Sequence, residues 1–254
     1  MISNDNIKRD ETYTFFAFSD VHGHFDALME GLNRAGFDIL NPKHILISCG
    51  DNFDRGSQNW SILCFLVDML KKDRLVAIYG NHEFFLDELF FGMRRLNHYD
   101  KENGTDITCY NFINKKDGIP SPKDIMQMKR AGYLMSRACD EFVYFEKRLT
   151  KKFETKNYIF AHGFIATEST PSWRDATWSC GHREIKMYPQ KKTVVFGHYF
   201  AFLSREFEEG TTENTDENNL EAIAENYYGD GYINIDSCTP YTKIVNVLRI
   251  EDEM

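Results

Sequence analysis

Carboxylate, imidazole and amide side chains follow several short apolar runs of this chain, at the point where each run ends. The densest group is segment 48–56, which follows the apolar run 44–47 and contains Asp51, Asp54 and Arg55. Carboxylates bind hard cations, and arginine bonds phosphate oxygens bidentately. The segment therefore predicts a metal ion held beside a phosphate, with an Asx-rich turn in a solvated loop as the simpler alternative for this segment alone.

Metal-competent side chains follow five predicted strands in succession. They are Asp20 with His22, Asp51, Asn81, His162 and His198. Ligands of open α/β sheets bind outside the carboxyl ends of the strands, so these side chains are predicted to meet at one rim. A single histidine after a strand is more often a hydrogen-bonded core residue, but five equivalent positions argue against that interpretation. Carboxylate, imidazole and amide donors without thiolate suit a pair of divalent cations such as manganese, iron or zinc.

The first 90 residues alternate between short apolar runs and helical patterns. The predicted strands and helices, in order, are 13–18, 25–35, 44–47, 59–72, 75–79 and 84–90. This alternation predicts parallel strands with helices on the faces, an α/β fold.

The rest of the chain is less regular, and no linker or internal repeat divides it, so residues 1–254 are predicted to form one domain. A polar segment with several glycines and prolines is expected to be an irregular insertion, and a second such segment a loop; they are 97–123 and 165–192. A helix is predicted over 123–147. Further strands are predicted at 157–160, 193–196, 232–236 and 243–248.

Residues 206–242 contain ten acidic side chains and no lysine or arginine. The first interpretation is a solvated, mobile loop, because unbalanced like charges are usually solvated. The second is a specificity loop that favours substrates with basic residues beside the phosphate.

Composition excludes several classes of protein. The net charge of −9 disfavours general binding to nucleic acids or anionic membranes. The six cysteines are scattered without a C-x-x-C pair, which is typical of reduced intracellular proteins. Residues 1–11 have no apolar signal core, and no apolar run is long enough to cross a membrane. A cytoplasmic protein is expected.

The motifs, in their order and spacing, resemble the calcineurin-like metallophosphoesterases, and more narrowly the bacterial and phage members of the phosphoprotein phosphatase (PPP) family. The matching segments are Asp20-x-His22, Gly50-Asp51-x-x-Asp54-Arg55-Gly56, Gly80-Asn81-His82-Glu83, Ala161-His162-Gly163 and Gly197-His198. The Asp-Arg-Gly ending and Glu83 point to the PPP branch. Segment 234–238 also resembles the late strand of bacterial members.

This resemblance implies a two-layered β-sandwich flanked by helices, with a dimetal centre at its rim. Asp20 and His22 would bind the first metal ion, Asp51 would bridge both, and the second site would be completed by Asn81, His162 and His198. Manganese is the metal favoured, with iron, zinc or nickel as alternatives. Two such cations can hold a bridging hydroxide and orient it for in-line attack on phosphorus.

The resemblance also implies catalytic roles. Arg55 would neutralise the phosphoryl oxygens, His82 would protonate the leaving group, and Asp54 would orient His82. A further phosphate-binding arginine is expected after the fourth strand, where Arg183 is preferred over Arg174.

The function predicted from these motifs is hydrolysis of phosphoserine and phosphothreonine in proteins. The alternative is hydrolysis of dinucleoside polyphosphates or another nucleotide at the same metal site, and a phosphodiesterase ranks third. A non-catalytic scaffold is disfavoured because no predicted metal ligand or catalytic residue is missing. The expected partners are a phosphorylated protein or a small phosphoester substrate, without general nucleic-acid or membrane binding.

Overall fold

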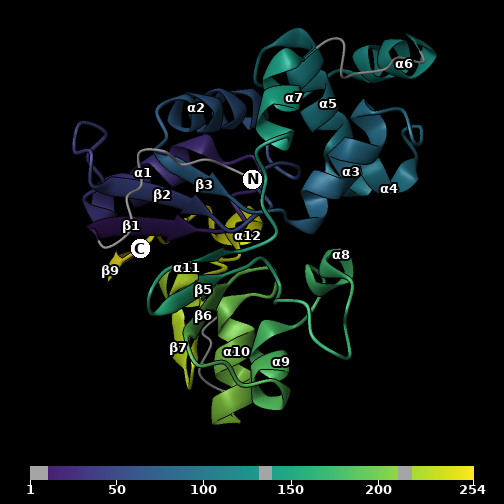
Figure 1. The fold of residues 1–254 in the computed structure, drawn as a ribbon. Coiled ribbons are helices and arrows are strands. Elements are labelled where there is room, and N and C mark those ends of the chain that lie inside the picture. Colours follow the sequence, from purple (N-terminus) through teal and green to yellow (C-terminus); the bar gives the residue numbers. More distant parts are fainter. Residues whose placement is uncertain (1–10, 132–138, 211–218) are drawn as a thin grey trace.

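The computed structural model describes residues 11–131, 139–210 and 219–254, and it contains two β-sheets that pack face to face (Figure 1). The first sheet has the order β3-β2-β1-β9, with β1 at Thr12–Phe18, β2 at His44–Ser48, β3 at Leu75–Ala77 and β9 at Leu248–Glu253. The second has the order β4-β5-β6-β8-β7, with β4 at Phe153–Glu154, β5 at Tyr158–Phe160, β6 at Thr193–Phe196, β7 at Tyr227–Gly229 and β8 at Tyr232–Asn234.

Alternate side chains of β1 pack on its two faces, one against the second sheet and the other against helices. Phe15 and Ala17 point between the sheets and pack in one cluster with Phe160 and Val195 of the second sheet. Phe16 and the other alternate residues pack against helices on the outer face. Successive strand side chains face opposite ways, so the apolar run 13–18 is buried on both faces.

Helices cover the outer faces of both sheets (Figure 1). On the first sheet lie α1 (Phe25–Ala35), α2 (Asn59–Lys71) and α7 (Asp140–Glu146), beside α3 (Asn81–Phe90). On the second lie α9 (Gly181–Met187) and α10 (Ala201–Glu209). The predicted α/β class, with parallel pairing of β1, β2 and β3, is confirmed. None of the helices in the described ranges has the length and hydropathy that a membrane crossing requires.

The predicted irregular insertion at 97–123 is wrong, because it contains α4 (His98–Asn103), α5 (Thr105–Asn114) and the start of α6 (Pro122–Ala131). Asn97 caps α4 by accepting bonds from the backbone of Tyr99 and Asp100, and Gly104, at φ 76°, joins α4 to α5. Several polar side chains of this segment are buried, including Asp100, Thr105 and Thr108, so its polar composition does not mean that it is a solvated loop. Buried polar groups removed the periodicity on which helix prediction depends.

Two further predicted elements differ from the structure. The helix predicted over 123–147 corresponds to α6 and α7, with 132–138 outside the described residues. The predicted loop at 165–192 contains α8 (Trp173–Ala176) and α9.

The strand predicted at 243–248 is also wrong, because the C-terminal strand is β9, antiparallel to β1. Segment 244–247 instead packs irregularly against α1, where Arg34 donates to the carbonyl of Val245 at 3.0 Å. Gly31 permits this approach, since a β-carbon there would lie 2.3 Å from the same carbonyl oxygen. Before β9 the chain also forms the short α12 (Thr239–Thr242).

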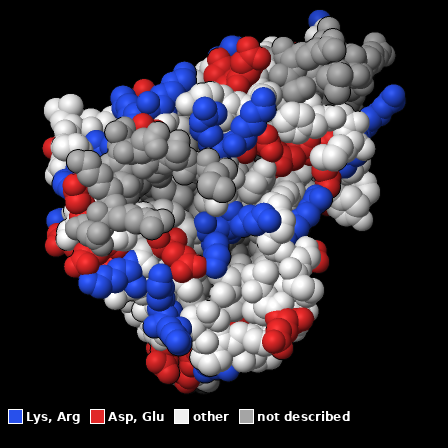
Figure 2. Space-filling model, in the orientation of Figure 1, with Lys and Arg blue, Asp and Glu red and all other residues white. Residues whose placement is uncertain are grey.

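The predicted acidic loop is helical in part. Its described residues belong to α10, to α11 (Leu220–Ala224) and to β7 and β8, while 211–218 lie outside the described residues. Glu208 of α10 pairs with Lys186 at 2.6 Å, so some of this acidic charge is balanced within the fold. On the face drawn in Figure 2, acidic and basic side chains are interspersed over the described surface.

Candidate dimetal active site

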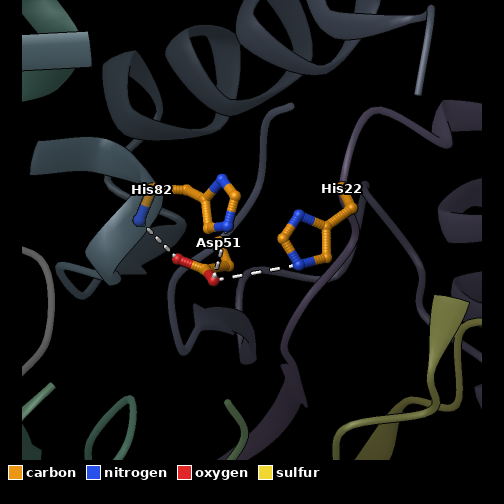
Figure 3. A group of neighbouring side chains, drawn as sticks. All are labelled: His22, Asp51 and His82. Carbon is orange, nitrogen blue, oxygen red and sulfur yellow. Dashed lines mark hydrogen bonds and ion pairs between the residues drawn. The ribbon is translucent and has the colours of Figure 1, made fainter. Parts of the chain in front are cut away.

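Asp51 lies at the centre of the site, where the chain leaves β2. It is buried, and its Oδ2 atom faces the Nε2 atoms of His22, His82 and His162 at 3.8, 3.9 and 3.4 Å. Its other oxygen accepts the backbone N–H of His82 at 2.9 Å. Figure 3 shows His22 and His82, from different segments, pointing toward the Asp51 carboxylate.

Two groups of metal-competent atoms share Asp51. One contains His22, Asp51 and His82, the other Asp51, His162 and His198, and within each group the ligand atoms lie within 4.8 Å of one another. A carboxylate common to two groups is the arrangement that a bridging ligand of two cations requires.

The orientation of two imidazoles fits metal binding. Nδ1 of His22 lies 3.0 Å from the carbonyl of Phe53, and Nδ1 of His162 lies 2.7 Å from the carbonyl of Cys49. Donation to these carbonyls places the hydrogen on Nδ1 and leaves the Nε2 lone pair facing Asp51. Metal-ligating histidines commonly fix their tautomer in this way. The donor chemistry and its orientation therefore fit two divalent cations.

Asp20 and Asn81 extend the two groups. Oδ1 of Asp20 lies 3.7 Å from Nε2 of His22, and Oδ2 accepts the backbone N–H of His198 at 2.9 Å. The amide oxygen of Asn81 lies 3.0 Å from Nε2 of His162. The structure thus brings together all six residues for which metal binding was predicted, and their roles as ligands stay predictions.

Backbone strain is concentrated in this cluster. Several of the non-glycine residues with positive φ belong to the site, namely Asp20, His22, Asp51, Asp54, Arg55 and His198. Such conformations cost about 1–3 kcal/mol each and persist where the surroundings over-determine them. Tight turns at the strand ends aim these side chains inward.

Glu83 connects two of those turns by hydrogen bonds. Its buried carboxylate accepts backbone N–H groups from Gly80 at 2.9 Å, Asp51 at 2.9 Å and Asn52 at 3.0 Å. It thereby links the end of β2 to the first turn of α3, which carries Asn81 and His82. In the sequence, Glu83 was only part of a motif that resembles a family. In the structure, it holds the backbone of the segments that carry Asp51 and His82.

His82 forms a buried pair with Asp54. Nδ1 of His82 lies 2.8 Å from Oδ2 of Asp54, and the Arg55 guanidinium lies 3.3 Å from Nε2 of His82. The two oxygens of Asp54 also accept the hydroxyls of Thr105 and Thr108, each at 2.7 Å. Helix α5 therefore fixes the carboxylate that orients His82.

Burial and charge shift the pKa values of the cluster in opposite directions. Burial opposes ionisation of Asp51, but the imidazoles of His162 and His82 outweigh burial and hold its pKa well below the usual range. Burial also disfavours charge on His162, yet the Asp51 carboxylate raises the pKa of His162 to about 10. Burial, with the charge of His162, lowers the pKa of His198 to about 3.

These shifts bear on metal binding. A histidine ligand must present a lone pair, so a cation would displace the proton from His162, and metal affinity would fall with acidity.

His82 differs from an ordinary buried histidine. Burial works against its charged form, but Asp51 and the bond to Asp54 outweigh burial and raise the pKa of His82. A histidine that keeps its proton in this way is suited to act as a general acid.

The two candidate phosphate-binding arginines lie elsewhere on the surface. Arg183 of α9 is exposed, with its guanidinium 5.8 Å from the ring centre of Phe207. Arg174 of α8 pairs with Glu88 of α3 and lies over the ring of Phe84 at 4.6 Å. Neither has a described contact with the histidine and aspartate cluster, and the role predicted for Arg183 stays a prediction.

Aromatic side chains lie beside His82 and His198. Trp178, 47% exposed, packs its ring 5.7 Å from that of His198 and 5.9 Å from that of Phe85. Phe85 packs 5.2 Å from His82, and Tyr199 packs 4.8 Å from His198. The sequence analysis assigned these three rings no role.

Asp236 is a further acidic residue that the sequence analysis left without a role. It follows β8 and is 1% exposed. Burial, and then the charge of Asp20, raise the pKa of this carboxyl well above its usual range.

The fold and the buried His/Asp cluster together are those of metal-dependent phosphoesterases. Residues 13–202 match the family model described as calcineurin-like phosphoesterase. That match covers most of the sequence, so the chain belongs to the calcineurin-like phosphoesterase family. The predicted family, the metallophosphoesterase class and the dimetal type of site are confirmed.

Solved structures support the fold. One is titled a putative diadenosine tetraphosphatase, with 15% identity and a TM-score of 0.51, over 97% of this chain and 96% of that chain. Another is a cold-active protein-tyrosine phosphatase of a psychrophilic Shewanella species, with 15% identity and a TM-score of 0.57, over 98% of this chain and 79% of that chain. No curated protein sequence matches the chain.

Proposed function

We propose that this metallophosphoesterase is of the PPP type and hydrolyses phosphoserine and phosphothreonine in proteins. The observation that carries the proposal is the buried His82–Asp54 pair, 2.8 Å apart, beside Arg55 and the Asp51 cluster. A serine or threonine alkoxide is a poor leaving group, so its departure depends on a proton donor, and the pair supplies one.

The proposal gives each residue of the site a role. Asp20, His22, Asp51, Asn81, His162 and His198 would hold the cations. Two divalent cations, when bound, activate water and neutralise phosphoryl charge. Arg55 is exposed beside His82 and is placed to bind phosphate oxygens. Asp54 orients His82 and holds the proton on its Nδ1 side, so Nε2 faces the reacting group.

Manganese is the proposed metal, with iron, zinc or nickel as alternatives, because the donors combine carboxylate, imidazole and amide oxygen. A cytoplasmic location is proposed from the cysteine usage. The proposed partner is a phosphorylated protein, with a small phosphoester as the alternative.

A second candidate, hydrolysis of dinucleoside polyphosphates, is favoured by one observation. Trp178, Phe85 and Tyr199 pack beside His82 and His198, and aromatic rings of this kind stack on nucleobases. A neighbouring structure titled a putative diadenosine tetraphosphatase motivates the same comparison. The rings would serve equally for the phenyl group of phosphotyrosine.

The deciding experiment measures steady-state hydrolysis by metal-stripped protein after manganese is added back. A phosphoserine peptide, a phosphotyrosine peptide and diadenosine tetraphosphate are compared at equal protein concentration. Manganese-dependent turnover of the phosphoserine peptide with the highest kcat/KM supports the proposal. Preferential turnover of diadenosine tetraphosphate keeps the site and replaces the substrate, and the Trp178→Ala variant should then lose kcat/KM selectively on that substrate.

A further inference from the structure

The carboxylate of Asp236 has one satisfied and one unsatisfied oxygen. Its Oδ1 accepts the backbone N–H of Cys238 at 2.9 Å. Its Oδ2 is buried and has no hydrogen-bond partner among the described residues. A buried polar oxygen without a hydrogen-bond partner is unfavourable, so this position calls for a specific explanation.

The sheet places Asp236 at the rim of the site. Strands β6 and β8 run parallel with Phe196 opposite Asn234, and the N–H of Ile235 donates to the carbonyl of Phe196 at 2.8 Å. Beyond the strands, the carbonyl of Asp236 accepts the backbone N–H of Ala201, three residues after His198, at 2.9 Å. The backbone N–H of His198 in turn donates to Asp20 at 2.9 Å. Segment 198–201 thus contacts both Asp20, which follows β1, and Asp236, which follows β8, and the two carboxyl groups are close enough for their charges to interact.

The two halves of the site have unequal sets of protein donors. His162, His198 and Asn81 join Asp51 on one side, whereas only Asp20 and His22 were predicted to join it on the other. On the Asp20–His22 side, with Asp51 included, three side chains would therefore hold the cation, and a further negative charge nearby would strengthen its binding.

We propose that Asp236 belongs to the metal site, and that its negative charge and free Oδ2 help to retain the cation on the Asp20–His22 side. A cation there would offset the repulsion between the two carboxylates and satisfy the buried oxygen. The proposal depends on the dimetal site of the family and is independent of which phosphoester is hydrolysed.

The test is manganese binding to metal-stripped protein by isothermal titration, comparing the parent with Asp236→Asn. The variant keeps the shape of the side chain and an oxygen for the N–H of Cys238, but loses the charge. The expected result is a loss of affinity of about tenfold at one of the two sites, the size typical for groups that support metal ligands, with the other site nearly unchanged.

Asp252→Asn is the matched control. Asp252 is a buried carboxylate that accepts two hydrogen bonds from Asn157, at 2.9 and 2.6 Å, and it pairs with Tyr13 at the opposite end of β1. Its substitution should leave both manganese affinities as in the parent.

Thermal unfolding gives a second readout, in which the variant is expected to have a higher Tm without metal and a smaller increase in Tm on adding manganese. Asp236→Asn should raise the Tm of metal-free protein, because it removes a buried charge beside Asp20, and it should reduce the increase in Tm caused by manganese. A purely structural role would lower the Tm in both states.

Unchanged manganese affinity in Asp236→Asn, or an equal loss in Asp252→Asn, would overturn the proposal. Asp236→Ser, which also keeps an oxygen for Cys238, guards against a folding failure. If neither Asp236 variant folds without metal, the carboxylate is needed for the fold of the loop and not for metal binding, and the proposal is likewise overturned.

Discussion

His82 can be assigned either of two roles from its contacts. Its bond to Asp54 and its raised pKa suit a general acid, whereas its Nε2 atom, 3.9 Å from Asp51 and within one of the two metal-competent groups, also suits a ligand. The PPP type that we propose corresponds to the first role. Substitution can separate the two roles, because only one of them depends on the leaving group.

We predict that His82→Asn lowers kcat on a phosphoserine peptide by about 10²–10⁴-fold, the usual contribution of a general acid. On p-nitrophenyl phosphate, whose leaving group needs little protonation, the loss should be much smaller. Steady-state rates on both substrates, with manganese content measured in parallel, provide the check. Equal losses accompanied by loss of one manganese ion would identify His82 as a ligand.

A residue distant in sequence fixes the partner of His82. Thr108→Val removes one of the hydroxyl donors to Asp54 while preserving side-chain shape. We predict a loss of about 1–3 kcal/mol in unfolding free energy, because a buried charged acceptor loses a bond, and a reduced kcat with KM nearly unchanged. Denaturant unfolding and steady-state kinetics measure the two effects.

Thr155→Val is the control for this change. Thr155 is buried, its hydroxyl accepts the N–H of Tyr158 at 3.2 Å, and it is hydrogen-bonded to Asp252 far from the cluster. It should cost stability without changing kcat. A fall in kcat of the same size in both variants would mean that Thr108 acts only through stability.

At the scale of elements, strand ends and helix starts do most of the positioning. The chain leaves β1, β2 and β6 through residues with positive φ, and α3 begins at Asn81 with its first turn held by Glu83. Helix α5, from the segment that was expected to be irregular, supplies both hydroxyls that bond Asp54.

Helix α3 also carries a destabilising carboxyl, Asp87. Burial, together with the charges of Glu146 and Glu83, raises its pKa to about 8. In the unfolded chain the value is about 3.9, so between these values the folded state binds the extra proton and stability falls as pH rises.

We therefore predict that Asp87→Asn is increasingly stabilising, relative to the parent, as pH rises from 5 to 8. An increment of 1 kcal/mol shifts Tm by about 2–4 °C in a chain of this size. Thermal unfolding of chelator-treated parent and variant at both pH values tests this, with Asp68→Asn on the exposed face of α2 as control. A Tm difference that does not change with pH would contradict the assignment.

At the scale of the whole molecule, the cluster joins the two sheets. Asp20 and Asp51 come from the first sheet, whereas His162 and His198 come from the second, and the bond from His198 to Asp20 crosses between them. A cation held there would bind only the folded state and so stabilise the sandwich as a unit.

We predict that a chelator lowers the Tm and that manganese restores it. A ligand at 100 times its Kd stabilises the folded state by about 2.7 kcal/mol. Differential scanning calorimetry over a series of manganese concentrations provides the measurement. Asp51→Asn, which removes the carboxylate shared by both groups, should show no response to either treatment; a normal response would show that manganese binds elsewhere.

The sequence by itself determined which strands are followed by metal-competent side chains. Short apolar runs soon followed by a metal-competent residue predicted the ends of β1, β2, β3, β5 and β6, because buried parallel strands are continuously apolar and their carboxyl ends share one rim. The family and the α/β class followed from the same motifs and are confirmed.

Tertiary structure alone decided what surrounds those residues. Thr108 and Glu83 hold their partners through contacts with residues distant in the chain or with backbone groups, and no local pattern predicts such contacts. The C-terminal strand likewise pairs with β1 only once the sandwich has formed. Periodicity reports which face of an element is buried, whereas the partner of a buried polar group depends on how distant elements pack.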